Sequence, residues 1–255
     1  MSSTVGVVIP AYRPDIPELR RYVTAIDETL DPETVVIELD SPKDGVEARL
    51  ADLPAVVETV PYRRGKGAAI TAGFEYLATD VLVFADADGS TPVDSLTSVV
   101  DRVTAGTADF AVGSRRHPDA EVASHQTFAR RFLGDGFAWL AGRLLSVSLH
   151  DYQCGAKAIT AEGWGRVRSH LYEPGFAWDV ELAAMAGALD LRVVEVPIRW
   201  EDRPGSTVSP VRDSLALFRA LLSAGHRAKH LSDDRLHTAI ASRREQPTAL
   251  VERER

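Results

Sequence analysis

Short apolar runs alternate with helical segments through the first half of the chain, and this alternation constrains the fold more than any other feature. Runs typical of buried strands occupy 5–9, 35–39, 56–60, 81–84 and 110–112, and Pro10 is expected to end the first of them. Segments with helical spacing occupy 16–30, 67–77 and 93–103. Strands that alternate with helices of about ten or more residues predict an α/β fold, with a mostly parallel sheet flanked by helices.

The second half is less regular, and its end differs in composition. The segment 128–149 is long and helical, 193–198 has the pattern of a strand, and 211–229 that of an amphipathic helix. From Ser232 onward charged residues dominate. We therefore expect one domain over residues 1–230 and a charged, mobile tail over 231–255.

Length and composition limit the class of protein. The 255 residues are 45% hydrophobic, which is enough for a sizeable core. No apolar run approaches the roughly 20 residues that a membrane-spanning helix needs, and the first strand begins too early to leave room for a signal peptide. These features predict an intracellular protein that is not integral to a membrane. The single cysteine, Cys154, excludes an internal disulfide and a cysteine-based zinc site.

The charge balance gives two further expectations. A formal net charge of −8 argues against a general nucleic-acid binder. Only four of the 29 basic residues are lysines. Many carboxylates with few lysines suit a high-salt cytoplasm, where salt screens their repulsion, although a GC-rich genome would produce the same bias. The sequence indicates no obligate protein partner.

Two aspartates follow the apolar run 81–84 directly. Asp86 and Asp88 are one residue apart, so on an extended chain their carboxylates point the same way. Two hard oxygen ligands at a strand end suit Mg²⁺ or Mn²⁺ holding a diphosphate. The alternative is an acidic turn before a helix, with Thr91 as N-cap and Pro92 in the first turn. That alternative explains Thr91 and Pro92 but not the two aspartates.

Polar turns follow three of the expected strands. They lie at 12–13, 40–45 and 86–90. Parallel sheets bind ligands at the carboxyl ends of their strands, so these turns should converge on one crevice. This convergence predicts a binding site there.

Seven short blocks, in order from about residue 5 to about 230, carry a resemblance to a known family. They are Val8 to Tyr12, Arg64 to Ala69, Asp86 to Gly89, Val112 to Arg115, Asp151 to Lys157, Trp178 to Glu181 and Val196 to Trp200. The chain resembles the inverting family 2 glycosyltransferases with the GT-A fold, and more narrowly the dolichyl-phosphate glucosyltransferases and mannosyltransferases. The block Asp-x-Gln-Cys-Gly-x-Lys is similar to one in the glucosyl branch.

The chain departs from the family pattern in three places. Arg13-Pro14-Asp15 stands where Asn-Glu is usual, so Asp15 is a possible replacement for the acid. The turn after the second strand keeps one acid, Asp40. Near residue 206 the chain has Gly-Ser-Thr instead of Gly-Ser-Lys, which removes a cation expected near a phosphate.

The resemblance implies metal-dependent transfer of a hexose from a nucleotide-sugar, with UDP-glucose favoured over GDP-mannose, to a dolichyl or polyprenyl phosphate. It implies that Asp86 and Asp88 hold Mg²⁺ or Mn²⁺ and that the catalytic residues are Asp86, Asp88, Asp179 and Glu181. The implied donor site comprises Pro10, Ala11, Tyr12, Asp15, Asp40, Lys66, Gly67, Asp86, Ala87 and Asp88. The implied acceptor site comprises Arg115, Arg131, Asp151, Lys157 and Arg203. An acceptor phosphate is already anionic, so it needs positioning more than deprotonation.

Each of these residues has a structural alternative. Tyr12 would merely cover the sheet edge, 64–67 would be a flexible turn, and the arginines would be solvated surface charges. Asp179 and Glu181 would be ordinary acids at a helix N-terminus.

Three other functions remain open at this stage. The same fold could act on a sugar hydroxyl, which requires a general base. A nucleotidyltransferase is disfavoured because the loop Gly-x-Gly-Thr-Arg is missing after the first strand. An inactive sugar-nucleotide binding module is disfavoured because both aspartates are present.

The lipid acceptor implies peripheral association with the cytoplasmic face of a membrane. The apolar residues that could lie at the membrane interface are Phe132, Phe137, Trp139, Leu140, Leu215, Leu217, Phe218, Leu221 and Leu222. The alternative is that most of them pack on the core of the domain.

Overall fold

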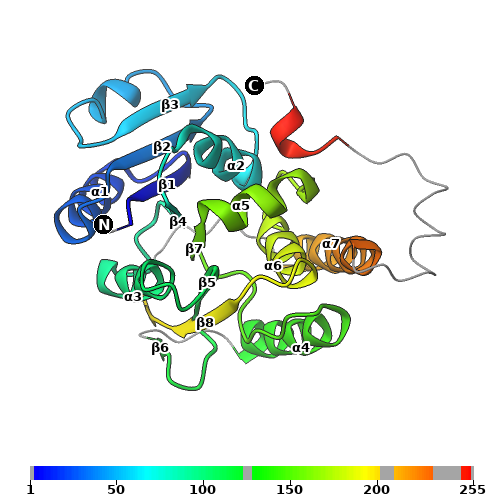
Figure 1. Cartoon of the computed structure of the whole chain (residues 1–255). Helices are drawn as coiled ribbons and strands as arrows, with labels where there is room; N and C mark the ends of the chain where they lie inside the picture. Colours follow the sequence, from blue (N-terminus) through cyan, green and yellow to red (C-terminus); the bar gives the residue numbers. More distant parts are fainter. Residues whose placement is uncertain (1–2, 123–127, 202–209, 232–247, 254–255) are drawn as a thin grey trace.

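A computed structural model of the chain describes residues 3–122, 128–201, 210–231 and 248–253. A seven-stranded sheet forms its centre, with strand order β3-β2-β1-β4-β7-β5-β8 (Figure 1). The strands are β1 (Val5–Tyr12), β2 (Thr34–Asp40), β3 (Val56–Val60), β4 (Val81–Ala85), β5 (Phe110–Ser114), β7 (Ala156–Thr160) and β8 (Val193–Pro197). All neighbouring strands are parallel except β7, which runs antiparallel between β4 and β5. The predicted α/β fold with a mostly parallel sheet is confirmed.

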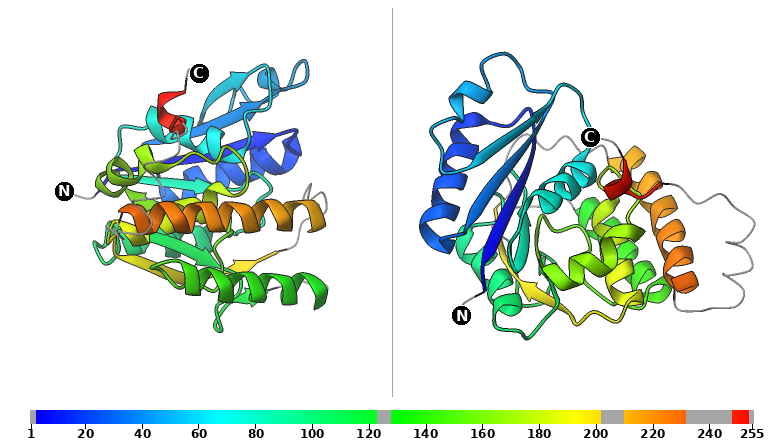
Figure 2. Two further views of the ribbon diagram at one scale, coloured as in Figure 1. Left: turned by 90° about the vertical axis from the view of Figure 1, so that its right-hand side faces the viewer. Right: turned by 45° about the horizontal axis from the view of Figure 1, so that its top comes forward.

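Helices cover both faces of this sheet (Figures 1 and 2). They are α1 (Ile16–Leu30), α2 (Lys66–Tyr76), α3 (Val93–Thr104), α4 (Phe128–Leu144), α5 (Ala161–Val167), α6 (Trp178–Ala188) and α7 (Pro210–Leu231). Short 3₁₀ turns occur at η1 (Glu47–Arg49), η2 (Arg168–His170) and η3 (Leu250–Glu252), and β6 (Glu121–Val122) pairs with β9 (Arg199–Trp200) in a second, two-stranded sheet.

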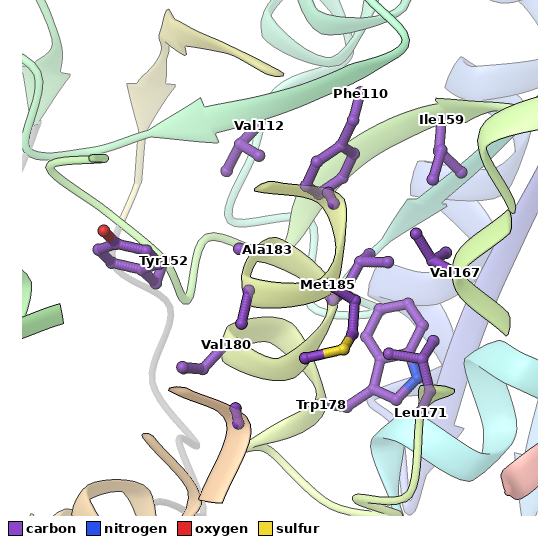
Figure 3. Packing of buried hydrophobic residues seen from close by; sticks show 14 of the residues in the cluster. Phe110, Val112, Tyr152, Ile159, Val167, Leu171, Trp178, Val180, Ala183 and Met185 are labelled. Atoms are coloured by element: carbon purple, nitrogen blue, oxygen red, sulfur yellow. The ribbon is translucent and has the colours of Figure 1, made fainter. Parts of the chain in front are cut away.

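The period of two along the strands divides the core into two layers. In β1, Val7 and Ile9 pack with α1 and α3 on one face, while Val8 packs with α2 and α6 on the other. The second layer is built around Trp178, whose ring lies edge-on to Phe84 at 5.6 Å between centroids. Figure 3 shows Trp178 beside Met185 and Leu171 in this layer. The first residue of α6 is thus fixed by the core, and this positions the residues that follow it.

The structure differs from the sequence expectations in several element bounds. Pro10 does not end β1, which continues to Tyr12. Beyond Val8, β1 pairs only with β2, so the missing N–H of Pro10 interrupts no pairing with β4. The helix expected over 128–149 ends at Leu144. The strand β7 was not expected from the sequence.

The tail also differs from its prediction. Residues 232–247 lie outside the described part of the chain, but 248–253 pack on the domain. Leu250 is buried, and its N–H donates to the carbonyl of Leu171 at 2.8 Å. Figure 1 shows this segment beside α2. The expectation of a mobile tail is therefore wrong for 248–253, where the burial of an apolar residue offsets the surrounding charge. The domain boundary at residue 230 stays a prediction.

Candidate active site

The strand order brings the predicted site residues to one edge of the sheet. Strands β2, β1 and β4 are neighbours and parallel, so Asp40, Tyr12 and the loop after Ala85 meet at their carboxyl ends. Because β7 is antiparallel, it starts at this same edge, with Ala156 opposite Ala85. This edge of the sheet therefore contains the carboxyl ends of β2, β1 and β4 and the amino end of β7.

The contact between Asp86 and Gly155 is very close. The Asp86 N–H donates to the Gly155 carbonyl at 2.9 Å, which continues the pairing of β4 with β7. A Cβ on Gly155 would lie 1.9 Å from Oδ2 of Asp86. Only glycine leaves room for this carboxylate. Gly155 belongs to the block Asp151 to Lys157 that carries the family resemblance, but the sequence predicted no function for it.

Four charged side chains form a group that we term the lysine–aspartate cluster: Lys66, Asp86, Lys157 and Asp179. Lys157 and Asp179 are buried, whereas the side chains of Lys66 and Asp86 are 11% and 40% exposed. The Nζ atom of Lys66 lies 2.9 Å from Oδ1 of Asp86 and 3.1 Å from Oδ2 of Asp179. The other oxygen of Asp179 lies 2.6 Å from Nζ of Lys157, which also donates to the Cys154 carbonyl. The structure thus joins residues predicted for the donor site, the acceptor site and catalysis.

Burial and neighbouring charges act against each other in this cluster. Burial alone would lower the pKa of Lys66, but Asp179 and Asp86 outweigh it and raise the pKa above its ordinary value. Burial alone would raise the pKa of Asp86, but Lys66 and then Lys157 and Arg115 lower it. Lys66 is therefore a cation and Asp86 an anion over the physiological range.

Asp88 is exposed, in contrast to the buried Lys157 and Asp179 of the cluster. Its Oδ1 accepts the N–H of Ser90 at 2.9 Å, which fixes the turn after β4. Partial desolvation and the negative charge of Asp86 raise the pKa of Asp88. A cation bound here would relieve that repulsion. Ala87, between the two aspartates, is half-buried.

The residues present fit a divalent metal ion. Among the described residues no three His, Cys, Asp or Glu side chains group into a metal site. Mg²⁺ typically takes one or two carboxylates and completes its shell with water and substrate phosphate oxygens. Asp88, with Asp86 beside it, matches that incomplete ligand set.

The half-buried Arg115 and the buried Asp151 form another ion pair at the end of β5. Nε and Nη2 of Arg115 donate to the two carboxylate oxygens at 2.6 and 3.0 Å. Burial opposes ionisation, but Arg115 outweighs it and lowers the pKa of Asp151 to about 2. The guanidinium of Arg115 also lies over the Trp200 ring. The side chain of Arg131 and the whole of Arg203, both predicted at the acceptor site, lie outside the described residues.

The carboxylate of Asp40 holds the loop that carries Lys66. Its oxygens accept the N–H of Arg64, the N–H of Gly65 and Nε of Arg64 at 2.7, 3.0 and 2.8 Å. Arg64 also pairs with Glu38. Gly65 has φ of 102°, a conformation that favours glycine, and Gly67 has no room for a Cβ beside Trp178. In the structure Asp40 binds the loop, and its predicted contact with the nucleoside stays a prediction.

Tyr12 lies at the end of β1 and contacts two arginines. The guanidinium carbons of Arg63 and Arg13 lie 4.3 and 5.1 Å from the centroid of its ring. In the preceding residues, Ala11 is buried and Pro10 is half-buried. Asp15 is exposed and caps α1 by accepting the N–H of Glu18 at 2.9 Å. The structure thus gives Asp15 a capping contact, and its predicted contact with the donor stays a prediction.

Glu181 lies away from the lysine–aspartate cluster. It is fully buried, and its Oε2 accepts the N–H groups of Tyr172 and Glu173, both at 2.8 Å. Its Oε1 pairs with Arg227 of α7. The structure therefore separates the two acids of α6: Asp179 faces the cluster, whereas Glu181 binds backbone and another helix. This geometry does not favour the predicted catalytic role of Glu181.

Comparison with known proteins identifies the family. Residues 6–144 match the family model described as glycosyl transferase family 2, and 86% of the chain aligns at 31% identity with the glycosyltransferase AglD of Haloferax volcanii. The chain belongs to glycosyl transferase family 2. The resemblance inferred from the sequence is confirmed. Similar relatives include the dolichyl-phosphate beta-glucosyltransferases of Mus musculus, 32% identical over 65% of this chain, and of Homo sapiens, 28% identical over 86%.

The aligned share of these relatives is uneven. The chain spans 36% of the length of AglD, 53% of the mouse enzyme and 74% of the human enzyme. Among solved structures, glucosyl-3-phosphoglycerate synthase of Mycobacterium tuberculosis, in complex with Mn²⁺, UDP and phosphoglyceric acid, matches 88% of this chain and 78% of its own. Its TM-score is 0.67 at 17% identity. Mannosyl-3-phosphoglycerate synthase of Rubrobacter xylanophilus gives 0.65 at 15% identity, covering 96% of this chain and 76% of its own. These likenesses support the GT-A fold.

Proposed function

We propose that the protein transfers a hexose, with inversion, from a nucleotide-sugar to a dolichyl or polyprenyl phosphate, and that UDP-glucose is the donor. The observation that carries this proposal is the lysine–aspartate cluster beside the exposed Asp88. It places a carboxylate for a metal ion next to cations suited to phosphate oxygens. The relatives named dolichyl-phosphate beta-glucosyltransferase support the acceptor and the sugar.

The metal would be Mg²⁺ or Mn²⁺, held by Asp88 with Asp86. When bound, it would stabilise the negative charge that develops on the departing nucleoside diphosphate. Lys66, the first residue of α2, would bind the same diphosphate, because its ammonium group lies beside Asp86. Tyr12 with Arg13 and Arg63 would hold the nucleoside end, at the adjacent strand.

The state of Asp179 favours a phosphate acceptor over a sugar hydroxyl. A hydroxyl acceptor requires a general base that is free to take a proton. Both oxygens of Asp179 bind ammonium groups, and the side chain is 2% exposed. A phosphate monoester needs no such base, so Asp179 would orient Lys66 and Lys157 while Arg115 binds the acceptor phosphate.

One face of the molecule suits the surface of a membrane. Trp139 of α4 is 62% exposed, and Phe218 and Leu222 of α7 are 41% and 46% exposed. Figure 2 shows α4 and α7 side by side, and Arg143 stacks on the Trp139 ring. Aromatic and aliphatic side chains flanked by arginine suit the interface of an anionic bilayer. Within the described residues, no helix combines the length and apolar composition needed to cross a bilayer.

A donor and acceptor screen tests the proposal. The protein is incubated with labelled UDP-glucose or GDP-mannose, dolichyl phosphate in vesicles and Mg²⁺ or Mn²⁺, and the lipid product is separated by chromatography. We expect labelled lipid with UDP-glucose and none after chelation of the metal. Product only with GDP-mannose would correct the donor, whereas transfer to glycan hydroxyls and not to lipid phosphate would overturn the acceptor.

A further inference from the structure

The ion pair between the buried Glu181 and the half-buried Arg227 lies outside the lysine–aspartate cluster, yet it is connected to it through the backbone. We propose that these two residues are positioning residues: they hold the segment 172–175, and that segment sets the place of the loop 65–68 with Lys66. The inference rests on the proposed function only in the statement that this loop binds the donor diphosphate.

The first step is the contact of Glu181 with the segment. Its Oε2 accepts two successive backbone N–H groups, from Tyr172 and Glu173, at 2.8 Å each. Burial raises the pKa of this carboxyl, and Arg227 counteracts that rise. A carboxylate that binds two amides in a fully buried place fixes the backbone there, because a neutral acid would accept these bonds less strongly.

The second step is the role of Arg227, which comes from a different helix. Its Nη2 binds Oε1 of Glu181, its Nη1 donates to Ser223 at 2.8 Å, and its guanidinium lies 5.0 Å from the centroid of the Tyr172 ring. Arg227 thus supplies both the counter-charge of Glu181 and a surface against which Tyr172 packs. Its Nε is buried and has no hydrogen-bond partner within the described part of the chain. This arrangement ties α7 to the segment 172–175.

The third step is the contact between the segment and the loop. The carbonyl of Pro174 accepts the N–H of Ala68 at 3.0 Å. A Cβ on Gly65 would lie 2.5 Å from this same carbonyl oxygen, and a Cβ on Gly67 would lie 2.6 Å from that of Glu173. Two backbones packed this closely cannot shift independently. Movement of 172–175 would therefore move Lys66 relative to Asp86.

Hydrogen exchange of the free protein tests this directly. In Arg227→Met, amides of 65–68 and 172–173 should exchange about tenfold faster, because local opening becomes easier, while amides of β1 and β4 keep their protection. Lys229→Met is the matched control, since Lys229 is an exposed cation on the same helix. Arg227→Lys and Glu181→Gln extend the test if the methionine variant folds poorly. Unchanged exchange of the loop in all three variants would overturn the proposal.

Binding of UDP with Mn²⁺, measured by calorimetry, links the loop to the donor. We expect the Kd to rise about tenfold in Arg227→Met, to recover in part in Arg227→Lys and to stay at the wild-type value in Lys229→Met. A looser loop with an unchanged Kd would overturn the positioning role. If the wild-type protein itself bound no UDP, the proposed function would fail, and the exchange result would still decide whether the pair holds the loop.

Discussion

Two ion pairs in this molecule have the same length but lie in different surroundings. Lys157 and Asp179 approach to 2.6 Å with side chains 1% and 2% exposed, whereas Arg192 and Asp109 approach to 2.6 Å with side chains 59% and 24% exposed. Surface pairs contribute about 0–1 kcal/mol, while buried charges cost several kcal/mol to desolvate unless their partners remain. A buried pair is therefore weak evidence of a stabilising interaction, and Asp179 of this pair also binds Lys66 at 3.1 Å.

The largest effect is expected at Asp88, where a substitution distinguishes a metal ligand from an ordinary surface acid. Asp88→Asn should lower kcat about a thousandfold, a rise of about 4 kcal/mol in the barrier, because the metal loses its carboxylate. The melting temperature should not change, since Asp88 is exposed. Asp94→Asn, at an exposed acid in the first turn of α3, is the control and should keep full activity. Near-normal turnover in Asp88→Asn would remove the metal role.

The next effect tests the buried pair against the surface pair. Asp179→Asn should reduce the free energy of unfolding by about 3 kcal/mol, because the buried ammonium group of Lys157 loses its counter-ion while Lys66 keeps only Asp86. Asp109→Asn should reduce it by less than about 1 kcal/mol. Urea unfolding of both variants measures the difference. Equal losses would contradict the comparison, and a double-mutant cycle with Lys157→Met would then show whether Asp179 and Lys157 are coupled at all.

A third prediction concerns the room that Asp86 needs. Gly155→Ala should lower kcat about a hundredfold, because a displacement of about 1 Å at a reacting centre has effects of that size. The new methyl group would lie 1.9 Å from Oδ2 of Asp86. Gly165→Ala on α5 is the control, because a Cβ there meets nothing within 4 Å. A fully active Gly155→Ala enzyme would mean that the position of Asp86 is not critical.

The smallest expected effect is on the free energy of unfolding at acid pH. The folded pKa of Asp151 is about 2, below its ordinary 3.8, so its pairing stabilises the fold above about pH 4 and is lost as the pH falls towards 2. This shift corresponds to about 2 kcal/mol. In Asp151→Asn, unfolding free energy should depend less on pH across that window.

Asp52 provides a surface counterpart to Asp151. Its pairing with Arg20 also lowers its pKa to about 2, but its side chain is 70% exposed. The pH dependence removed by Asp52→Asn should therefore vanish in high salt, whereas that removed by Asp151→Asn should persist. If salt abolished both equally, the distinction between the buried and surface pairs would be wrong.

Features that depend on local pattern could be predicted from the sequence. The convergence of Tyr12, Asp40 and Asp86 follows from apolar runs of strand length and from the rule for parallel sheets. Lys66 lies beside Asp86, while the contact of its loop with a diphosphate stays a prediction. In these cases each residue stands next to the strand or helix that positions it.

Features that depend on distant partners could not be predicted in the same way. The strand β7 contains Lys157, which reads as polar although it is buried against Asp179, 22 residues further on. Gly155 has a role only once Asp86 is placed opposite it. The separation of Asp179 from Glu181 did have a signal, because residues two apart on a helix point about 200° apart. The apolar pair Ala249-Leu250 likewise marked the packed part of the tail.

The antiparallel strand β7 has a consequence for the order of assembly. It lies between β4 and β5 in the sheet, and it follows β4 by some seventy residues of chain. Until it docks, a growing polypeptide presents β4 as an open edge, with Asp86 lacking the carbonyl of Gly155 and the neighbouring charge of Lys157. Closure of that edge and completion of the candidate active site are therefore one event, so a chain that stalls before residue 160 exposes an open strand edge and lacks the completed site.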